Sequence, residues 1–189
     1  VYGVAYDAVT REQRSHAKTV NFSILYGAGP QNISRQLGIG RNEARELIDQ
    51  YFKTYRGLKA YMTDVVEQAR KNGYVSTLLG RKRILRDINS RNALARANAE
   101  RVAINTPIQG TAADMIKLAM IHIHDEFRRK KLDAKMILQV HDELVFDTPK
   151  AERDEVCRIV IDKMKNAIPG LGVPIEVGLG YGDNWLEAH

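Results

Sequence analysis

The sequence of 189 residues contains few of the features that mark secreted, membrane or disulfide-bonded proteins. Its single cysteine, Cys157, excludes an internal disulfide and a cysteine-rich metal site, and we expect it to act as a small buried hydrophobic residue. The apolar runs are too short to predict a membrane-spanning helix, and we expect no secretory signal. No internal repeat or low-complexity segment is visible. These features are typical of a globular protein of a reducing cytoplasm.

Length and composition limit the number of domains and indicate the charge of a binding partner. A chain of this length with an apolar fraction of 44% can form one sizeable domain or two subdomains that share an interface. The net charge is +6 and the isoelectric point is about 9.4, which favours nucleic acid or another polyanion as a partner. Many ordinary domains are equally basic, so the charge alone does not decide the function.

The stretch from residue 11 to residue 26 has the strongest pattern in the chain. Two cations and then two aromatic rings recur at every fourth position: Arg14, Lys18, Phe22 and Tyr26. On an α-helix such residues share one face, where the cations could hold a polyphosphate and a ring one turn later a base or a sugar. The same stretch also fits an ordinary amphipathic helix with solvated cations. Its buried residues would then be Ala17, Val20, Ile24 and Leu25.

Local signals predict both ends of this helix. Thr10 and Gln13 have the spacing of a capping box, in which each side chain bonds the backbone N–H of the other residue. Gly27 suits the left-handed position that follows a helix, and the dipeptide Gly29-Pro30 prevents its continuation. We therefore expect a helix from about residue 11 to residue 26.

The remaining sequence predicts an α+β protein in two parts. Apolar periodicity and turn residues predict helices over residues 30–37, 42–55, 58–71, 91–105, 108–130 and 149–167. Apolar and β-branched runs predict strands over residues 74–79, 83–85, 135–140, 144–148 and 173–179. Ser90 is the expected cap of one helix, and Pro107 is expected in the first turn of the next. We place a boundary near residue 105, between a mainly helical part and an antiparallel sheet with helices on one face.

Two predicted turns carry charged side chains. The first, Gly80-Arg81-Lys82, gives a hairpin a basic tip that could contact phosphates or face solvent. The second, His141-Asp142-Glu143, joins the strands predicted over residues 135–140 and 144–148. A carboxylate in a tight turn between strands is exposed and rigidly held, which suits a Mg²⁺ ligand. Taken by itself, this acidic pair also fits a polar turn without a catalytic role.

The order Arg-x-x-x-Lys-x-x-x-Phe-x-x-x-Tyr-Gly in residues 14–27 resembles the nucleotide-binding helix of the A-family DNA polymerases, the bacterial DNA polymerase I type. Residues 139–143, Gln-Val-His-Asp-Glu, resemble the carboxylate hairpin of the same family. Further matching segments follow in the family's order, over residues 73–75, 79–81, 100–101, 105–114 and 182–185. The resemblance covers essentially the whole chain. It implies a fingers subdomain over residues 1–105 and the C-terminal part of a palm subdomain over residues 106–189.

The resemblance implies an enzyme that transfers a nucleotide from a deoxynucleoside triphosphate to a primer 3′-hydroxyl, in DNA replication and repair in a bacterial cytoplasm. It assigns Arg14 and Lys18 to the β- and γ-phosphates, and Lys18 also to the departing pyrophosphate. Phe22 would pack against the sugar and, because it lacks a hydroxyl, predicts discrimination against nucleotides without a 3′-hydroxyl. Tyr26 would stack near the templating base, where Gly27 would let the backbone approach closely.

Primer–template DNA is the partner that the resemblance implies. Gln109 would read the minor groove near the primer terminus, where the acceptors are shared by all correct base pairs. His141 would lie near the primer terminus, and Arg101 and Asn105 would contact the template strand. These last three residues also fit structural or solvated roles.

Two Mg²⁺ ions are the implied cofactors, with Asp142 as a metal ligand and Glu143 as an auxiliary carboxylate. The family's other metal-binding aspartate lies on a strand before the nucleotide helix, and Asp7 lacks that context. We therefore expect the second carboxylate to lie outside this chain, which would represent the fingers and the later palm and make negligible DNA alone. An apolar face left uncovered in such a fragment could drive self-association.

Two hypotheses from other classes compete with a polymerase. A metal-dependent phosphohydrolase could use His141 and Asp142 with His122 and His124. That scheme needs its His-Asp pair on a helix, and residues two apart do not share a helix face. A basic helical module that only binds nucleic acid would explain the charge, but neither the acidic turn nor the four-residue spacing. Metal-dependent binding of a triphosphate would separate such a module from a polymerase.

Overall fold

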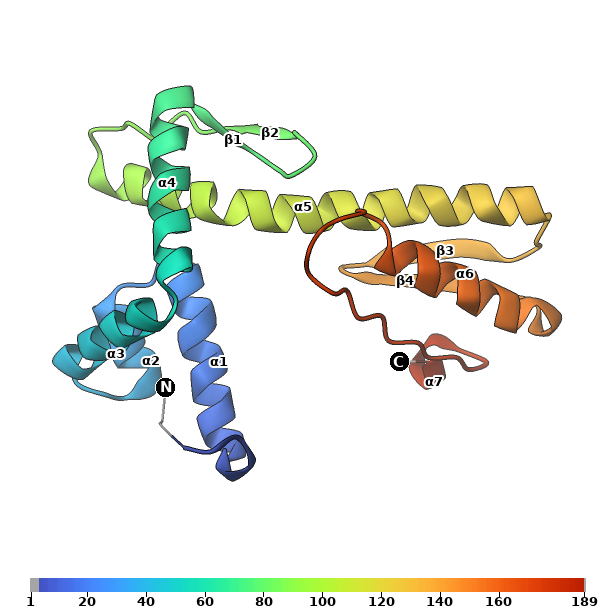
Figure 1. Cartoon of the computed structure of the whole chain (residues 1–189), viewed down its shortest axis with the longest axis horizontal. Helices are drawn as coiled ribbons and strands as arrows, with labels where there is room; N and C mark the ends of the chain where they lie inside the picture. Colours follow the sequence, from blue (N-terminus) through green and yellow to red (C-terminus); the bar gives the residue numbers. More distant parts are fainter. Residues whose placement is uncertain (1–3, 189) are drawn as a thin grey trace. The chain divides into compact units, whose positions relative to one another are not determined.

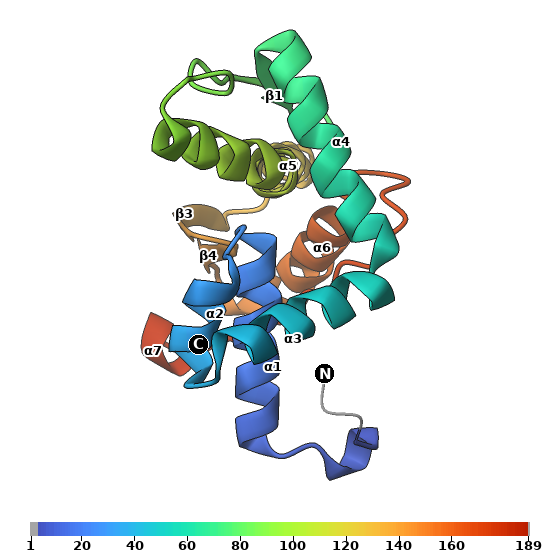
Figure 2. The same ribbon diagram turned by 90° about the vertical axis from the view of Figure 1, so that its left-hand side faces the viewer.

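The computed structural model describes residues 4–188, and Figures 1 and 2 show the chain from two sides. The chain divides into two compact units, one ending at Gly110 and the other beginning at Thr111. Each unit combines helices with a two-stranded antiparallel sheet, which confirms the predicted α+β class. Within residues 4–188, no helix is both long and apolar enough to cross a membrane.

The first three helices of the first unit share a small core. They are α1 (Arg11–Leu25), α2 (Pro30–Leu37) and α3 (Arg41–Thr54), which follow a short 3₁₀ turn. Val20 and Ile24 of α1 are 1% and 2% exposed and pack in one cluster with Ile33 of α2 and with α3. The apolar face predicted for α1 is therefore confirmed at Val20 and Ile24, whereas Ala17 and Leu25 are only half-buried.

A second core in this unit lies beneath a hairpin. The helix α4 (Arg56–Asn72) leads into β1 (Tyr74–Ser76) and β2 (Lys82–Ile84), which pair antiparallel. The buried residues of this core are Ala69, Val75, Leu85, Ile88, Ala99 and Ala103. The predicted hairpin is confirmed with shorter strands. Of the two cations expected at its tip, Lys82 instead belongs to β2, and its amino group lies 4.5 Å from the centroid of the Tyr74 ring.

One long helix, α5 (Ala93–Lys130), replaces the two helices that the sequence predicts on either side of Pro107 (Figure 1). A proline inside a helix removes one backbone hydrogen bond and crowds the carbonyls of the preceding turn. The hydroxyl of Tyr61 donates a hydrogen bond of 3.1 Å to the Ile104 carbonyl in that turn. Buried alanines on α5 also hold this stretch in the second core. Tertiary contacts therefore carry the helix through a residue that locally favours a helix start.

The cap of α5 is also corrected by the structure. The side chain of Asn92 accepts hydrogen bonds from the backbone N–H groups of Leu94 and Ala95, at 2.9 and 3.3 Å. Ser90, the expected cap, instead accepts a hydrogen bond of 3.2 Å from the backbone N–H of Asn92. The helix consequently begins two residues later than predicted, at Ala93.

The division between the units falls after Gly110, whereas the sequence places it near residue 105. Thr106 is buried, and Arg83 of β2 donates a hydrogen bond of 3.5 Å to its hydroxyl. A Cβ added at Gly110 would lie 2.5 Å from the Thr77 methyl, so glycine allows α5 to approach the hairpin closely. These contacts attach one further turn of α5 to the first unit.

The second unit packs a hairpin and a helix against the C-terminal half of α5. Its elements are β3 (Lys135–Val140), β4 (Glu143–Asp147), the 3₁₀ turn Lys150–Glu152, α6 (Arg153–Lys165) and α7 (Trp185–Ala188). The Phe127 ring of α5 meets the Phe146 ring of β4 edge-on, with centroids 5.8 Å apart. The buried residues of this core are Ala119, Ile123, Phe127, Ala134, Val156, Ile159, Val160 and Ala167. Cys157 of α6 is only half-buried.

Two predictions for this unit are wrong, one about the bounds of a helix and one about the presence of a strand. The helix expected over residues 149–167 begins at Arg153, after a separate 3₁₀ turn, and ends at Lys165. Within the described residues, no strand forms over residues 173–179, and the sheet of this unit contains β3 and β4 alone. A strand requires a neighbouring backbone for its N–H and C=O groups, and the apolar pattern of residues 173–179 does not supply one.

Candidate functional site

Three of the four residues spaced along α1 form a continuous exposed line. The amino group of Lys18 lies 5.9 Å from the centroid of the Phe22 ring. The Phe22 and Tyr26 rings are stacked, with centroids 6.3 Å apart and planes inclined by 15°. Both rings are nearly half exposed, at 46% and 47%. Arg14 is exposed one turn earlier on the same helix face. Within residues 4–188, neither Arg14 nor Lys18 forms an ion pair.

The ends of α1 form as the local sequence predicts. The Thr10 hydroxyl accepts a hydrogen bond of 3.1 Å from the Gln13 backbone, and the Thr10 backbone donates one of 3.0 Å to the Gln13 side chain. At the other end Gly27 has a φ of +74°. Its N–H bonds the Ile24 carbonyl at 2.9 Å, and the next N–H bonds the Ser23 carbonyl at 2.8 Å, which is a Schellman motif. The last ring of the line, Tyr26, is thus held at the helix cap.

The structure brings the end of α1 together with α5. The Gln109 side-chain amide donates a hydrogen bond of 3.2 Å to the Tyr26 hydroxyl. A Cβ added at Gly27 would lie 3.0 Å from the Arg101 Cγ, so this glycine also permits a close approach between the two elements. Arg101 is exposed and donates to the Asn98 side chain, and Asn105 is half-buried. Four predicted site residues from two elements therefore share one surface, a link that no sequence signal shows.

The acidic turn lies in the second unit and is tighter than predicted. Val140 pairs with Glu143, so the turn contains two residues, His141 and Asp142, and Glu143 is the first residue of β4. Asp142 is exposed and Glu143 is half-buried. His141 has a φ of 53°, a left-handed conformation that histidine adopts more often than most residues. The imidazole of His141 and the carboxylate of Asp142 are therefore carried by adjacent residues at the tip of the β3–β4 hairpin.

Sequence reasoning assigns no role to Gln139, which supports this turn. Its side-chain amide donates a hydrogen bond of 3.0 Å to the His141 carbonyl. Two signals point to this residue: it is a polar residue on a strand whose neighbours are mostly apolar, and it is the first residue of the family-like segment 139–143. Gln139 therefore holds the backbone on which Asp142 is presented.

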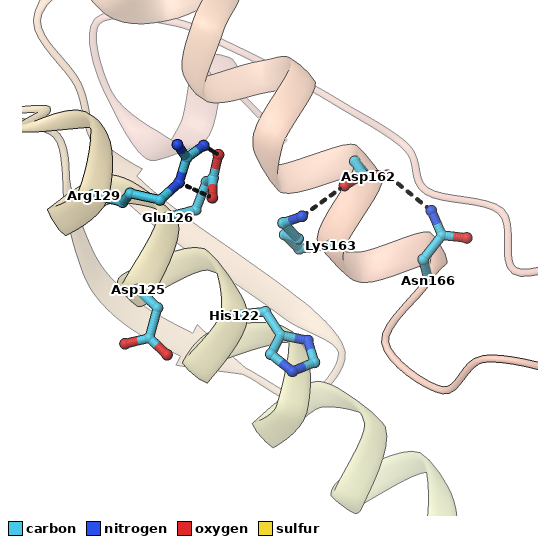
Figure 3. A pocket seen from close by; sticks show the side chains of 7 residues that line it. All are labelled: His122, Asp125, Glu126, Arg129, Asp162, Lys163 and Asn166. Carbon is cyan, nitrogen blue, oxygen red and sulfur yellow. Dashed lines mark hydrogen bonds and ion pairs between the residues drawn. The ribbon is translucent and has the colours of Figure 1, made fainter.

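A cleft of about 360 Å³ between α5 and α6 contains His122, one of the residues of the phosphohydrolase hypothesis (Figure 3). Arg129 donates a hydrogen bond of 3.0 Å to Glu126, which holds the pKa of that carboxyl below its ordinary value. Hydrogen bonds from Lys163 and Asn166 likewise hold the pKa of Asp162 below its ordinary value. Neither residue of the acidic turn lines this cleft, so the cleft is a surface separate from that turn.

The ligand set of the phosphohydrolase hypothesis is not assembled. His122 and His124 lie on α5, whereas His141 and Asp142 form a strand-to-strand turn. Across the part of the chain that the structure describes, no three histidine, cysteine or carboxylate residues lie close enough together to bind one metal ion.

Comparison with known proteins shows the family. The family model for DNA polymerase family A matches residues 1–187. The chain belongs to DNA polymerase family A. Among its relatives in that family, DNA polymerase I of Bacillus caldotenax is 46% identical over 188 residues, which are 100% of this chain and 21% of that protein. DNA polymerase I of Treponema pallidum is 45% identical over 189 residues, 100% of this chain and 19% of that protein. The chain thus spans about a fifth of the length of these family A relatives.

A solved structure agrees in fold. The POL domain of Pol1 from M. smegmatis, in complex with DNA primer-template and dNTP, is similar with a TM-score of 0.94 and a sequence identity of 43%. The similarity covers 99% of this chain and 33% of that one. The α+β arrangement described above is therefore that of a polymerase domain segment.

Proposed function

We propose that the protein to which this chain belongs carries out template-directed DNA synthesis, with nucleotidyl transfer from a deoxynucleoside triphosphate to a primer 3′-hydroxyl. The observation that carries the proposal is the exposed line on α1. Lys18, Phe22 and Tyr26 lie in one row, with a cation 5.9 Å from the first ring and the two rings 6.3 Å apart. Such a row can hold a charged phosphate chain at one end and flat groups at the other.

Arg14 and Lys18 hold the β- and γ-phosphates in this proposal. Arginine offers a planar fork of donors and lysine a compact point charge, and neither is neutralised by an ion pair within residues 4–188. Phe22 packs against the sugar and Tyr26 lies near the templating base, where Gly27 ends the helix. Lys18 also stabilises the departing pyrophosphate.

The DNA contacts fall to both units. Gln109 has a second amide N–H besides the one that bonds Tyr26, and this group can donate to a minor-groove acceptor at the primer terminus. Arg101 and Asn105 contact the template strand in the proposal, and His141 lies near the primer terminus. The fingers and palm assignments of the two units belong to the same proposal, as does a bacterial cytoplasmic location.

Asp142 fits a divalent cation, for which we propose Mg²⁺. Its carboxylate is exposed on a two-residue turn, and hard oxygen ligands of this kind are those that Mg²⁺ prefers. Glu143 stands beside it as an auxiliary carboxylate. The bound ions supply charge stabilisation at the attacking and leaving oxygens. Gln139 and the β3–β4 pairing keep the Asp142 carboxylate in place.

Calorimetric titration of the 189-residue chain with a deoxynucleoside triphosphate and Mg²⁺ tests the nucleotide site. Arg14→Ala and Lys18→Ala should each weaken binding roughly tenfold or more, because each removes a charge-assisted contact. Arg35→Ala and Lys71→Ala remove equal charge from exposed positions on α2 and α4, and should leave binding unchanged. Equal binding by all four variants would contradict the proposed site.

Synthesis itself needs a complete polymerase. In a hybrid of the Bacillus caldotenax relative, this chain can replace the 188 matching residues. The hybrid should extend a primer, and Asp142→Asn should abolish extension while Asp133→Asn, another exposed acidic position, leaves it intact. Extension that survives Asp142→Asn would refute the metal role. The expectation that the chain alone makes negligible DNA stays a prediction, which the same assay measures.

A further inference from the structure

The helices α3 and α4 meet at a corner (Figure 2). Side chains of both helices line a cleft of about 630 Å³ at this corner, and the proposed polymerase site does not use it. We call it the elbow cleft. The residues relevant to its chemistry are Asp49, Phe52, Lys53, Arg56, Lys59 and Asp64. None of the residues of the α1 line, and none of the acidic turn, lines it.

The cations of the elbow cleft are available to a ligand. Lys53, Arg56 and Lys59 are exposed, and across residues 4–188 none of them forms an ion pair. Arg56 is oriented by a hydrogen bond of 3.4 Å to the Lys53 carbonyl. The amino group of Lys59 lies 5.9 Å from the centroid of the Phe52 ring. Three cations thus lie at one corner. Within the described residues, the two carboxylates of the cleft, Asp49 and Asp64, form no ion pair with them.

An exposed aromatic ring stands at the same corner. Tyr55 lies in the sequence between Lys53 and Arg56, and it is 54% exposed. Its ring packs against the buried Tyr51, with centroids 4.8 Å apart, and the side chain stays exposed. Tyr55 does not line the elbow cleft itself, but it is the residue that joins α3 to α4 at the same corner. Proteins bind single-stranded nucleic acid through exposed aromatic rings and cations on one surface, because unpaired bases stack on the rings and phosphates pair with the cations.

We propose that the elbow cleft, together with Tyr55, binds single-stranded DNA at a second surface of the protein. The cations contact successive phosphates, and a base stacks on the exposed ring of Tyr55. Duplex DNA is disfavoured, since its bases are already stacked, and an acidic peptide would gain nothing from the exposed ring. The recognition chemistry stands on its own, whereas the choice of DNA as the strand rests on the proposed function.

The carboxylates of the cleft make the proposal sharply testable. Asp49 and Asp64 repel phosphates, so Asp49→Asn combined with Asp64→Asn should tighten binding of a strand several-fold. A purely structural role for these exposed carboxylates gives no reason for a gain in affinity.

The test is fluorescence anisotropy of a labelled sixteen-residue oligothymidine titrated with the 189-residue chain. A triple alanine variant at Lys53, Arg56 and Lys59 should weaken binding at least tenfold. It should also reduce the slope of log affinity against log salt by about 2, as expected for three lost phosphate contacts. A matched triple variant at Arg128, Lys131 and Lys135, exposed positions of the second unit, should change affinity less than twofold. Equal losses in the two triple variants would overturn the proposal.

Two further arms identify the ligand class and guard against misfolding. Tyr55→Leu should weaken oligothymidine binding about tenfold and leave binding of a polyglutamate peptide unchanged. Polyglutamate that binds as tightly as oligothymidine, with no effect of Tyr55→Leu, would assign the surface to an acidic protein and overturn the proposal. Arg56→Ala alone, at an exposed position, provides a folded variant if the triple variant loses its thermal transition.

Failure of this inference can be told from failure of the proposed function. The elbow variants should leave triphosphate binding unchanged. Arg14→Ala and Lys18→Ala should weaken triphosphate binding, but they should not alter the difference in oligothymidine affinity between the two triple variants. A loss of triphosphate binding in the elbow variants would show that the elbow cleft belongs to the nucleotide site, which overturns its separate assignment.

Discussion

Gln109 of α5 donates a hydrogen bond of 3.2 Å to the hydroxyl of Tyr26 at the end of α1, across a sequence separation of 83 positions. Both side chains are exposed, and both are site residues in the proposed polymerase. The same two elements approach again where Arg101 lies against Gly27. The surface proposed for the templating base and the primer terminus is therefore assembled by tertiary contacts between α1 and α5.

A double-mutant cycle should detect the bond between Tyr26 and Gln109. Tyr26→Phe and Gln109→Ala each remove one partner, and their effects on the free energy of unfolding should couple by about 0.5 kcal/mol, the lower end for an exposed bond. Urea denaturation measures each variant. The control cycle pairs Tyr26→Phe with Gln68→Ala, an exposed amide on α4, and should show no coupling. Coupling equal to that control would contradict the bond.

Gly27→Ala should lower the free energy of unfolding by about 1–2 kcal/mol, because an alanine is strained at a φ of +74°. Its methyl would also lie 3.0 Å from the Arg101 Cγ. Gly57→Ala is the matched control, since nothing lies within 4 Å of its added Cβ and the residue is within α4. That control should raise stability by about 0.5 kcal/mol. Chemical denaturation should therefore show a lower free energy of unfolding for Gly27→Ala and a higher one for Gly57→Ala. A lower free energy of unfolding in both variants would argue against the conformational explanation.

Lys131 occupies at the end of α5 the position that Gly27 occupies after α1. Its φ is 56°, and the N–H of Leu132 bonds the Phe127 carbonyl at 3.0 Å, as in a Schellman motif. Lys131→Gly should therefore raise the free energy of unfolding by about 0.5–1 kcal/mol. Lys117→Gly, in the interior of α5, should lower it by about 1 kcal/mol. A thermal melt that ranks both variants below the parent chain would contradict this reading of the Lys131 backbone.

Tyr61→Phe should lower the free energy of unfolding by about 1 kcal/mol, because it deprives the Ile104 carbonyl of its hydroxyl partner. Burial raises the pKa of Tyr61 above its ordinary value of 10.0, so the unfolded chain ionises first. The contribution is present below pH 10 and is lost as the pH rises through the folded-state pKa. Denaturation at neutral and at alkaline pH should show that the difference in free energy of unfolding between parent and variant becomes smaller at alkaline pH. Tyr181→Phe, at a residue 68% exposed, should have no effect at either pH.

Glu126→Gln should make the chain less sensitive to acid. The hydrogen bond from Arg129 holds the pKa of Glu126 below its ordinary value of 4.5, so this carboxylate stabilises the fold above that pH. The contribution is lost as the pH falls through the lower, folded-state pKa. Thermal midpoints of parent and variant should therefore differ at neutral pH and converge in acid. Glu46→Gln, an exposed position on α3, should show no such convergence.

Local chemistry accounts for the predictions that succeeded. The capping box of Thr10 and the left-handed Gly27 bound α1 because their partners lie within a few residues. The helices α2, α3 and α4 and both hairpins also lie where periodicity and turn residues place them. The structure gives the positions of the site side chains, but the roles assigned to them stay predictions.

The sequence by itself determined the family, the helix that carries the four spaced side chains and the hairpin that presents Asp142, because each depends on near neighbours along the chain. Only the tertiary structure decided the continuity of α5 through Pro107, the absence of a strand over residues 173–179 within the described chain, and the contact of Gln109 with Tyr26. Each of these depends on a partner that is distant in sequence. A hydroxyl from α4 reaches the turn before the proline, an unpaired segment lacks a neighbouring backbone, and an amide on α5 meets a ring on α1. Such partners become available only when the chain has folded.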